Sequence, residues 1–276
     1  MSVIARLLRA GLHLAAACAI SGLVYPFASR GLRATLQRRW SRELLAILGV
    51  RLRASARPPV ATGLLVANHV SWLDIVAIHA IAPSAFVCKA EVARWPVLGW
   101  LVGRQGTVFL HRGSARAARR TLEVVRERLA AGERIVLFPE GTTSDGADVL
   151  DFRPALFQAA VDCGALVQPL ALSYSSPVAA FLGEQSLWQS LRAVASAKDL
   201  EIEVRICTPL ASGRRDRRSL AAAARRAIQT RLAGGSRRPG VRGEGATAPT
   251  GSGSAEGTLP SSTAQIRASR LAVSRA

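Results

Sequence analysis

From Thr62 onward, short apolar runs alternate with longer segments in which apolar residues recur at helical spacing. A short run that is apolar along its whole length is typical of a strand covered on both faces, and the intervening helices supply that cover. We therefore predict an α/β fold with a mixed, mostly buried sheet flanked by helices. The strands are expected at 64–67, 85–88, 107–110, 134–138, 166–174 and 200–208, and the helices at 75–81, 114–131, 154–163 and 217–232.

The charge of the chain restricts its partners. With 37 Lys and Arg against 18 Asp and Glu in 276 residues, the net charge is +19, while 49% of the residues are hydrophobic. That hydrophobic fraction excludes wholesale disorder and supplies a sizeable core. A basic chain suits nucleic acid, an anionic lipid surface or an anionic substrate. Aromatic residues make up only 5% and are missing from the arginine clusters, so a membrane partner fits better than a nucleic acid.

The cysteines predict neither disulfides nor a metal site. Cys18, Cys88, Cys163 and Cys207 are scattered, without the spacing of a disulfide framework or a zinc site, which indicates a reducing, cytosolic setting.

The N-terminus carries an apolar run from Ala10 to Ala28, with arginines on both sides. About 20 helical residues cover a bilayer core of ~30 Å. Three interpretations compete: a cleaved signal peptide, for which Ala28-Ser29-Arg30 is a poor cleavage site; a spanning helix; and an interfacial anchor continued by the amphipathic stretch 40–50. We expect membrane attachment and leave its mode open.

These segments divide the chain into three expected parts. Residues 1–55 form membrane-associating helices, and residues 56–233 form the α/β domain. Residues 234–276 are dominated by Gly, Ser, Pro, Thr and Arg and are expected to be a disordered basic tail.

The densest group of chemically active residues, 68–74, follows the expected strand 64–67 and opens a helix. A histidine, His69, precedes a carboxylate, Asp74, by five positions. Such a pair suits a general base, because the carboxylate orients the imidazole and stabilises its protonated form. The two can meet only if His69 lies in the turn and Asp74 in the first helical turn, since a regular helix would place them about 140° apart. The same segment also fits a capping box from Ser71 to Asp74, a purely structural role that is compatible with the catalytic one.

Two further segments end expected strands. Glu140, after the strand 134–138, could accept a hydrogen bond from a substrate hydroxyl, and Gly141 allows close backbone approach. The alternative is an ordinary polar turn. Arg112, after the strand 107–110, has a planar fork suited to a phosphate or carboxylate, or is a surface arginine.

Together and in this order, these segments resemble the glycerolipid acyltransferase family typified by lysophosphatidate acyltransferase (1-acyl-sn-glycerol-3-phosphate acyltransferase). The resemblance covers residues 60–210. The matching motifs are NHxxxxD at Asn68, His69 and Asp74, a block from Lys89 to Arg112, Phe-Pro-Glu-Gly-Thr from Phe138 to Thr142, and Val-x-Pro at Val167 and Pro169.

The resemblance implies a role for each matching position. His69 would deprotonate the acceptor hydroxyl, which attacks the thioester carbonyl of acyl-CoA or acyl carrier protein, and Asp74 would orient His69. The residues implied in substrate binding are Asn68, Lys89, Arg112, Glu140, Gly141 and Thr142.

The resemblance further implies an acyltransferase fold with a membrane-associating N-terminus. No metal or cofactor is expected, and acyl-CoA or acyl carrier protein serves as co-substrate. The expected partners are a lysolipid acceptor, the acyl thioester donor and membrane lipid, without nucleic acid, at the cytoplasmic face of the cell's inner membrane.

One departure concerns the acceptor. Many members that use a phosphate-bearing acceptor have an arginine directly after Glu-Gly-Thr, where this chain has Thr143. Its Glu-Gly-Thr-Thr-Ser-Asp-Gly is similar to members that acylate lyso-ornithine lipid, which has no phosphate. The function that the resemblance implies is a membrane-associated O-acyltransferase of the 1-acyl-sn-glycerol-3-phosphate type, in phospholipid biosynthesis. A lyso-ornithine lipid O-acyltransferase is the alternative, and a non-catalytic basic protein that binds lipid or nucleic acid is the more remote one.

Overall fold

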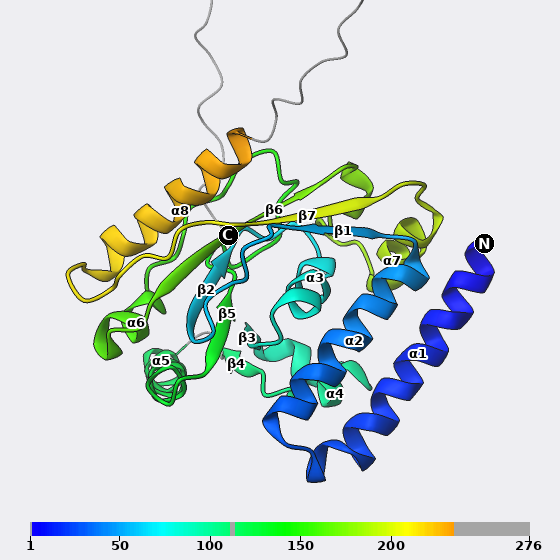
Figure 1. Ribbon diagram of the computed structural model, residues 1–276, viewed down its shortest axis with the longest axis horizontal. Coiled ribbons are helices and arrows are strands. Elements are labelled where there is room, and N and C mark those ends of the chain that lie inside the picture. The colour runs from blue at the N-terminus through cyan, green and yellow to red at the C-terminus, as the bar shows by residue number, and fades with distance from the viewer. Residues whose placement is uncertain (1, 111–113, 235–276) are drawn as a thin grey trace, which may run out of the picture. The chain divides into compact units, whose positions relative to one another are not determined.

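The computed structural model describes residues 2–110 and 114–234 (Figure 1). Within them, seven strands form one sheet in the order β1-β7-β6-β2-β5-β3-β4, and every neighbouring pair is parallel except β6 and β7. The predicted mixed α/β fold is therefore confirmed. The strands are β1 Arg51–Ala54, β2 Gly63–Ala67, β3 Ala85–Lys89, β4 Val108–Leu110, β5 Arg134–Leu137, β6 Val167–Tyr174 and β7 Glu201–Ile206.

Helices cover both faces of the sheet, as Figure 1 shows. Helices α2, α3 and α7 pack on one face, and α5, α6 and α8 pack on the other. The helices are α1 Val3–Leu23, α2 Arg30–Leu48, α3 Leu73–Ile81, α4 Leu98–Arg104, α5 Ala115–Ala130, α6 Phe157–Cys163, α7 Leu187–Ser196 and α8 Arg217–Ala233, with short 3₁₀ helices at Tyr25–Phe27, Ala90–Arg94 and Pro177–Ala179.

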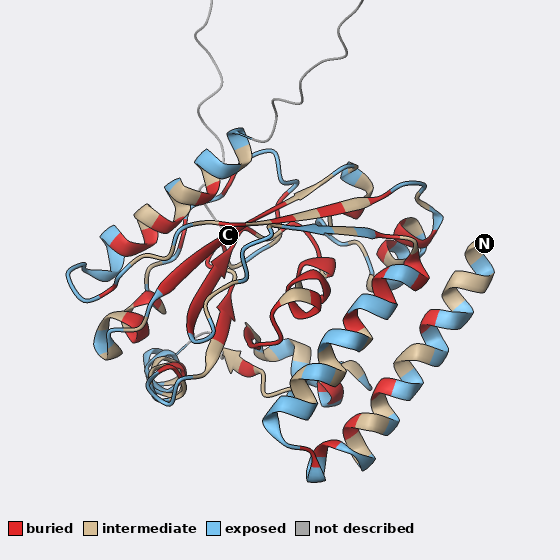
Figure 2. Ribbon diagram, viewed as in Figure 1, coloured by how far each residue is buried: buried red, intermediate tan, exposed pale blue. Residues whose placement is uncertain are grey.

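The central strands are buried because they serve two cores at once. All five residues of β2 are buried: Leu65 and Ala67 belong to the core under α2 and α3, whereas Leu64 and Val66 belong to the core under α5 and α8 (Figure 2). Successive strand side chains point to opposite faces, so a strand between two helical layers is apolar at every position. This pattern made β2 recognisable as a short continuous apolar run.

Helices α1 and α2 form a hairpin. Trp40 donates its indole N–H to the carbonyl of His13 over 3.0 Å, the His13 ring pairs with the carbonyl of Trp40 over 2.9 Å, and the two rings stack. The second helix buries Leu45 and Leu48 in the core. Arg6 of α1 donates to backbone carbonyls at the end of α7, which holds the start of the hairpin on the domain.

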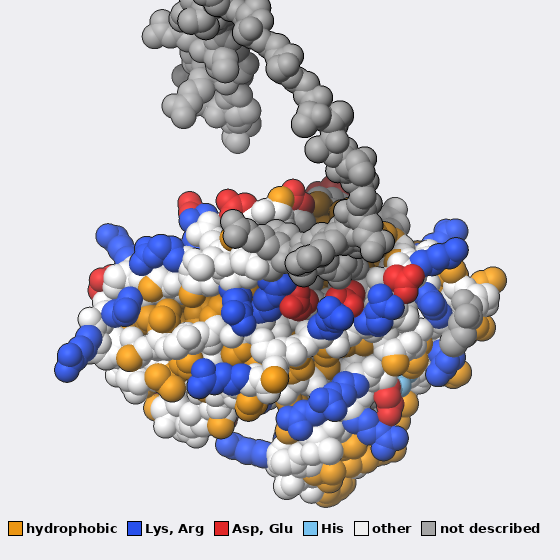
Figure 3. Space-filling view, turned by 45° about the horizontal axis from the view of Figure 1, so that its top comes forward, with side chains coloured by type: hydrophobic (Ala, Val, Ile, Leu, Met, Phe, Trp, Pro, Cys, Tyr) orange, Lys and Arg blue, Asp and Glu red, His pale blue; other side chains and the backbone are white. Residues whose placement is uncertain are grey.

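By length and composition, the 21-residue helix α1 is long and apolar enough to cross a bilayer. Most of its side chains lie outside the core: Leu8 is 65% exposed, Leu12 is 72% exposed, and Phe27, just after the helix, is 90% exposed. In Figure 3, basic side chains are scattered over the visible face and hydrophobic ones gather along its lower right edge. The expected N-terminal apolar helix is therefore present.

Several elements differ from the prediction. Helix α6 begins at Phe157 rather than at 154, because Pro154 and the next two residues form 3₁₀-type turns. The short elements β1, α4 and α7 were not anticipated. The expected tail, apart from Gly234, and Arg112 lie outside the described residues.

Candidate active site

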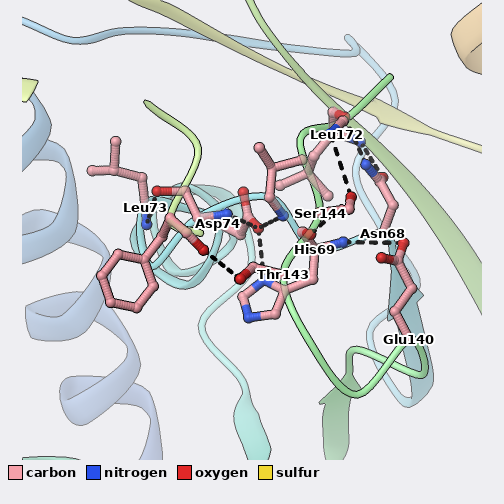
Figure 4. Close-up of polar contacts among 12 residues, drawn as sticks. Asn68, His69, Leu73, Asp74, Glu140, Thr143, Ser144 and Leu172 are labelled. Carbon is pink, nitrogen blue, oxygen red and sulfur yellow. Dashed lines mark hydrogen bonds and ion pairs between the residues drawn. The ribbon is translucent and has the colours of Figure 1, made fainter. Parts of the chain in front are cut away.

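The two main predicted motifs lie at the same edge of the sheet. Strands β2 and β5 are parallel neighbours, with Val66 beside Leu137, so the segments that follow them leave the sheet together. His69 is in the turn after β2, and Glu140 is in the loop after β5 (Figure 4). The carboxyl ends of parallel strands are where α/β proteins commonly place ligand sites.

His69 and Asp74 meet as predicted. Nδ1 of His69 lies 2.8 Å from Oδ2 of Asp74, with the histidine in the turn and the aspartate in the first turn of α3. The Asp74 side chain has no solvent exposure, whereas that of His69 is 19% exposed. Because Nδ1 faces the carboxylate, Nε2 is the ring nitrogen left for a ligand, and it has no hydrogen-bond partner among residues 2–110 and 114–234.

The carboxylate of Asp74 is held by several donors. Oδ2 also accepts backbone N–H groups from Val70, over 2.7 Å, and from Ser71, over 2.9 Å. Oδ1 accepts the phenol O–H of Tyr174, the last residue of β6. Four donors on one buried carboxylate keep its charge compensated and its orientation fixed.

The catalytic and capping interpretations of this segment prove compatible. Asp74 reaches back to the N–H of Ser71, which is one half of the predicted capping box. The other half is changed, because the Ser71 hydroxyl faces the N–H of Leu73 at 3.4 Å and the helix N-cap is Trp72. One carboxylate thus caps the turn and contacts the histidine.

The His69 ring lies against an aromatic side chain. It stacks on Phe138 with ring centroids 4.0 Å apart and planes inclined by 14°. Phe138 follows β5, so the strand beside β2 supplies one wall for the imidazole. This contact limits rotation of the ring, which keeps Nε2 pointing away from Asp74.

Glu140 lies beside the same histidine. Its Oε1 accepts the backbone N–H of His69 over 3.4 Å, and its buried Oε2 has no hydrogen-bond partner among the described residues. Burial raises the pKa of Glu140 to about 7, and the charge of Asp74 acts in the same direction. A buried carboxyl oxygen with an unmet hydrogen bond is suited to a polar group of a ligand.

Asn68 is placed to hold the turn. Its side-chain N–H donates to the carbonyl of Leu172, and its side-chain oxygen accepts the N–H of Leu172, both over 2.9 Å. The amide therefore extends the pairing of β2 with β6 by one residue and fixes where His69 begins. Contact between Asn68 and substrate stays a prediction.

The loop after β5 is closed by its own contacts. Gly141 has a φ of 72°, which favours glycine, and a Cβ there would lie 3.1 Å from Nε of Arg153. Thr142 is exposed, whereas the hydroxyl of Thr143 donates to the carbonyl of Phe181. Residue 143 is thus turned toward the backbone of residue 181.

The remaining predicted residues are less closely tied to the site. Lys89 is exposed at the end of β3, two strands from β2. Arg112 lies outside the described residues.

Comparisons with known proteins agree with the motifs. A family model described as acyltransferase matches residues 51–173. Lyso-ornithine lipid O-acyltransferase of Pseudomonas aeruginosa is 36% identical over 208 residues, which is 74% of this chain and 80% of that protein. This chain belongs to the acyltransferase family.

Two further acyltransferases are similar. The 1-acyl-sn-glycerol-3-phosphate acyltransferase of Neisseria meningitidis is 45% identical over 135 residues, 48% of this chain and 53% of that protein. The crystal structure of the 1-acyl-sn-glycerophosphate acyltransferase of Thermotoga maritima superposes with a TM-score of 0.59 at 21% identity, covering 86% of this chain and all of that one. The latter match concerns the fold.

The structure places near the candidate site residues that the sequence analysis did not predict. Tyr174 and Arg153 are far from the histidine motif in sequence, and only the strand order brings the tyrosine to Asp74. Phe138 belonged to a recognised motif, but its stacking on His69 could not be read from the sequence.

Proposed function

We propose that this acyltransferase is membrane-associated and transfers a fatty acyl group from an acyl thioester to the hydroxyl of a lysolipid, with His69 as general base. The observation that carries the proposal is the contact between Nδ1 of His69 and the buried carboxylate of Asp74, which leaves Nε2 for the acceptor hydroxyl. A general base must reach the proton that it removes, and the imidazole must be held in the correct tautomer.

In the proposed reaction the acyl group passes directly from the thioester to the acceptor, without an acyl-enzyme. The acceptor O–H gives its proton to Nε2 of His69, and the oxygen attacks the thioester carbonyl carbon to form a tetrahedral intermediate. Collapse of that intermediate breaks the carbon–sulfur bond, and the departing thiolate takes the proton from the imidazolium. Asp74 stabilises the positive charge on the ring between the two steps. No serine or cysteine side chain of the described residues hydrogen bonds with the His69 ring, which supports direct transfer.

For the acceptor we propose lyso-ornithine lipid. Thr143 occupies the position after Glu-Gly-Thr and donates to the carbonyl of Phe181, so this position supplies no cation for a phosphate. Two lyso-ornithine lipid O-acyltransferases, from Pseudomonas aeruginosa and Brucella abortus, align over 80% and 90% of their lengths.

The second candidate acceptor is 1-acylglycerol 3-phosphate. The Neisseria relative named for this acceptor is 45% identical in the region that aligns. In addition, the exposed Arg153 lies against Gly141 in the loop after β5, where its guanidinium could meet an anionic head group.

The proposed attachment is interfacial. Arg6 holds helix α1 on the end of α7, and the His13–Trp40 contact holds it on α2, while Leu8 and Leu12 are exposed. A helix that packs on its domain on one side and exposes apolar residues on the other suits the boundary of a bilayer. The cytoplasmic face of the inner membrane is proposed because soluble acyl thioesters reach that face.

The test offers the purified protein both lysolipids side by side. Each is supplied with a donor labelled in its acyl group, once as acyl-CoA and once as acyl carrier protein loaded with the acyl chain. We expect labelled diacyl product from lyso-ornithine lipid, and loss of that product in His69→Ala. Equal turnover by His69→Ala would refute the proposed base. Acylation of the phosphate lipid alone would reverse the choice of acceptor, and salt-sensitive lipid binding without product from either acceptor would favour a binding protein.

A further inference from the structure

Tyr174 makes a contact that the proposed reaction does not by itself require. It is the last residue of β6, and its phenol O–H donates to Oδ1 of Asp74 (Figure 4 shows this aspartate). Strand β6 is the parallel neighbour of β2, with Leu170 beside Ala67, so Tyr174 extends beyond the point where β2 turns into the His69 segment. The strand thus delivers a phenol to the far side of the carboxylate.

The two oxygens of Asp74 have different neighbours. Oδ2 contacts Nδ1 of His69 and accepts the N–H groups of Val70 and Ser71. Oδ1 accepts from Tyr174 alone among the described residues. The three contacts on Oδ2 are local in sequence, whereas the contact on Oδ1 spans 100 positions. The orientation of the carboxylate therefore depends on a second element of the fold.

We propose that Tyr174 is a positioning residue for the general base, holding Asp74 so that Oδ2 faces His69 and drawing part of the negative charge toward Oδ1. This inference rests on the proposed function, because it assigns a role within the same proton transfer. A hydrogen bond to an ionised group is stronger than one between neutral groups, so the phenol moderates the charge that the imidazole meets.

The state of the phenol fits this role. Burial raises the pKa of Tyr174 well above its usual value, and the negative charge of Asp74 raises it further. The group therefore stays a neutral donor throughout the working pH range. Glu140 is a further titratable group beside the pair; its pKa is raised to about 7, and the charge of Asp74 contributes to that shift.

The test is the pH profile of acyl transfer by Tyr174→Phe, which keeps the ring and removes the donor. We expect kcat to fall about tenfold, as for loss of one hydrogen bond to a charged group, with KM for the lysolipid changed by less than about twofold. The acid limb of kcat/KM should move to higher pH, because the charge of Asp74 then concentrates on Oδ2 and favours protonated His69. Both enzymes are compared with Glu140 in place, so that its contribution to the limb is common to the two profiles and the difference between them reports the change at Tyr174.

The chain offers a matched control and a reverse experiment. It contains two tyrosines, and Tyr25 lies between α1 and α2, so Tyr25→Phe should leave the acid limb in place. Biosynthetic fluorotyrosine in a Tyr25→Phe background labels Tyr174 alone. A fluorinated phenol is a stronger donor, so the acid limb should move to lower pH. This nearly isosteric change tests the inference even if Tyr174→Phe folds poorly.

The outcomes separate the two proposals. A parent enzyme without acyl transfer to either lysolipid refutes the proposed function. An active parent whose acid limb is unmoved by both changes at Tyr174 refutes only the positioning role. An acid limb that moves to higher pH in Tyr174→Phe and to lower pH with fluorotyrosine supports the positioning role. A merely structural contribution would alter the amount of folded enzyme and leave the acid limb in place.

Discussion

Ser144 donates its backbone N–H to the carbonyl of His69 over 2.8 Å, so the loop after β5 is fastened to the turn after β2. The Ser144 hydroxyl faces the same carbonyl at 3.3 Å. With Glu140 accepting the N–H of His69, both backbone polar groups of the histidine are held by one loop. Two motifs that lie about 70 positions apart in sequence therefore act as one rigid site.

Replacing Asp74 by Asn should leave the fold intact and lower acyl transfer by about 10³-fold. The amide oxygen can still accept from Val70, from Ser71 and from Nδ1 of His69, but it presents no negative charge to the imidazolium that forms when the acceptor hydroxyl loses its proton. The measurement is initial-rate product formation with a saturating lysolipid, with circular dichroism as the control for folding. A variant within about threefold of the parent rate would contradict the assigned role.

Glu140 should make stability depend on pH. Its pKa is raised from 4.5 to about 7, so between these values the folded protein binds a proton that the unfolded chain has released. The contribution of this group is fully present below pH 4.5 and is lost as pH rises through 7, a change of about 3 kcal/mol. Urea unfolding midpoints should therefore fall over this range, and Glu140→Gln should reduce the slope. A parent and a variant with the same pH dependence would contradict the raised pKa.

Asn68→Ala should lower the free energy of unfolding by about 2–3 kcal/mol, because it leaves the N–H and the carbonyl of Leu172 without their partners. Thermal unfolding measures this loss. Asn68→Asp is the matched variant: it keeps an acceptor for the N–H but faces the carbonyl with a negative charge, so it should not restore stability. If Asn68→Ala melted at the same temperature as the parent, the amide contacts would contribute nothing to the free energy of unfolding.

Membrane attachment should depend on the outward side chains of α1. Changing Leu8 and Leu12 to Asn should weaken binding to anionic vesicles roughly tenfold for each leucine, since each loses its burial in the bilayer boundary. Vesicle co-sedimentation measures the effect. Leu166→Asn, at an exposed leucine before β6, is the control and should bind as the parent does. Equal losses at all three positions would argue against α1 as the attachment surface.

Much of the core was predictable because its signals are local. β2, β3, β5 and β6 lie between helical layers or pair at the centre, and they show up as apolar runs. Helix α5 was found from its cap, with the Ser114 hydroxyl accepting the N–H of Ala117. β1 escaped prediction because it is an edge strand, largely exposed, whose place depends on pairing with β7.

By itself the sequence determined the order of the elements and the chemical groups that flank β2 and β5. If His69 and Asp74 were to meet, their spacing already required a turn followed by a helix, since no regular helix brings positions five apart onto one face. The tertiary structure decided which distant groups complete the site: Tyr174 on Asp74, Phe138 on His69, and Leu172 on Asn68. These contacts follow from the strand order β6-β2-β5. That order arises from the burial of whole strand faces, and it cannot be read from the spacing of residues along the chain.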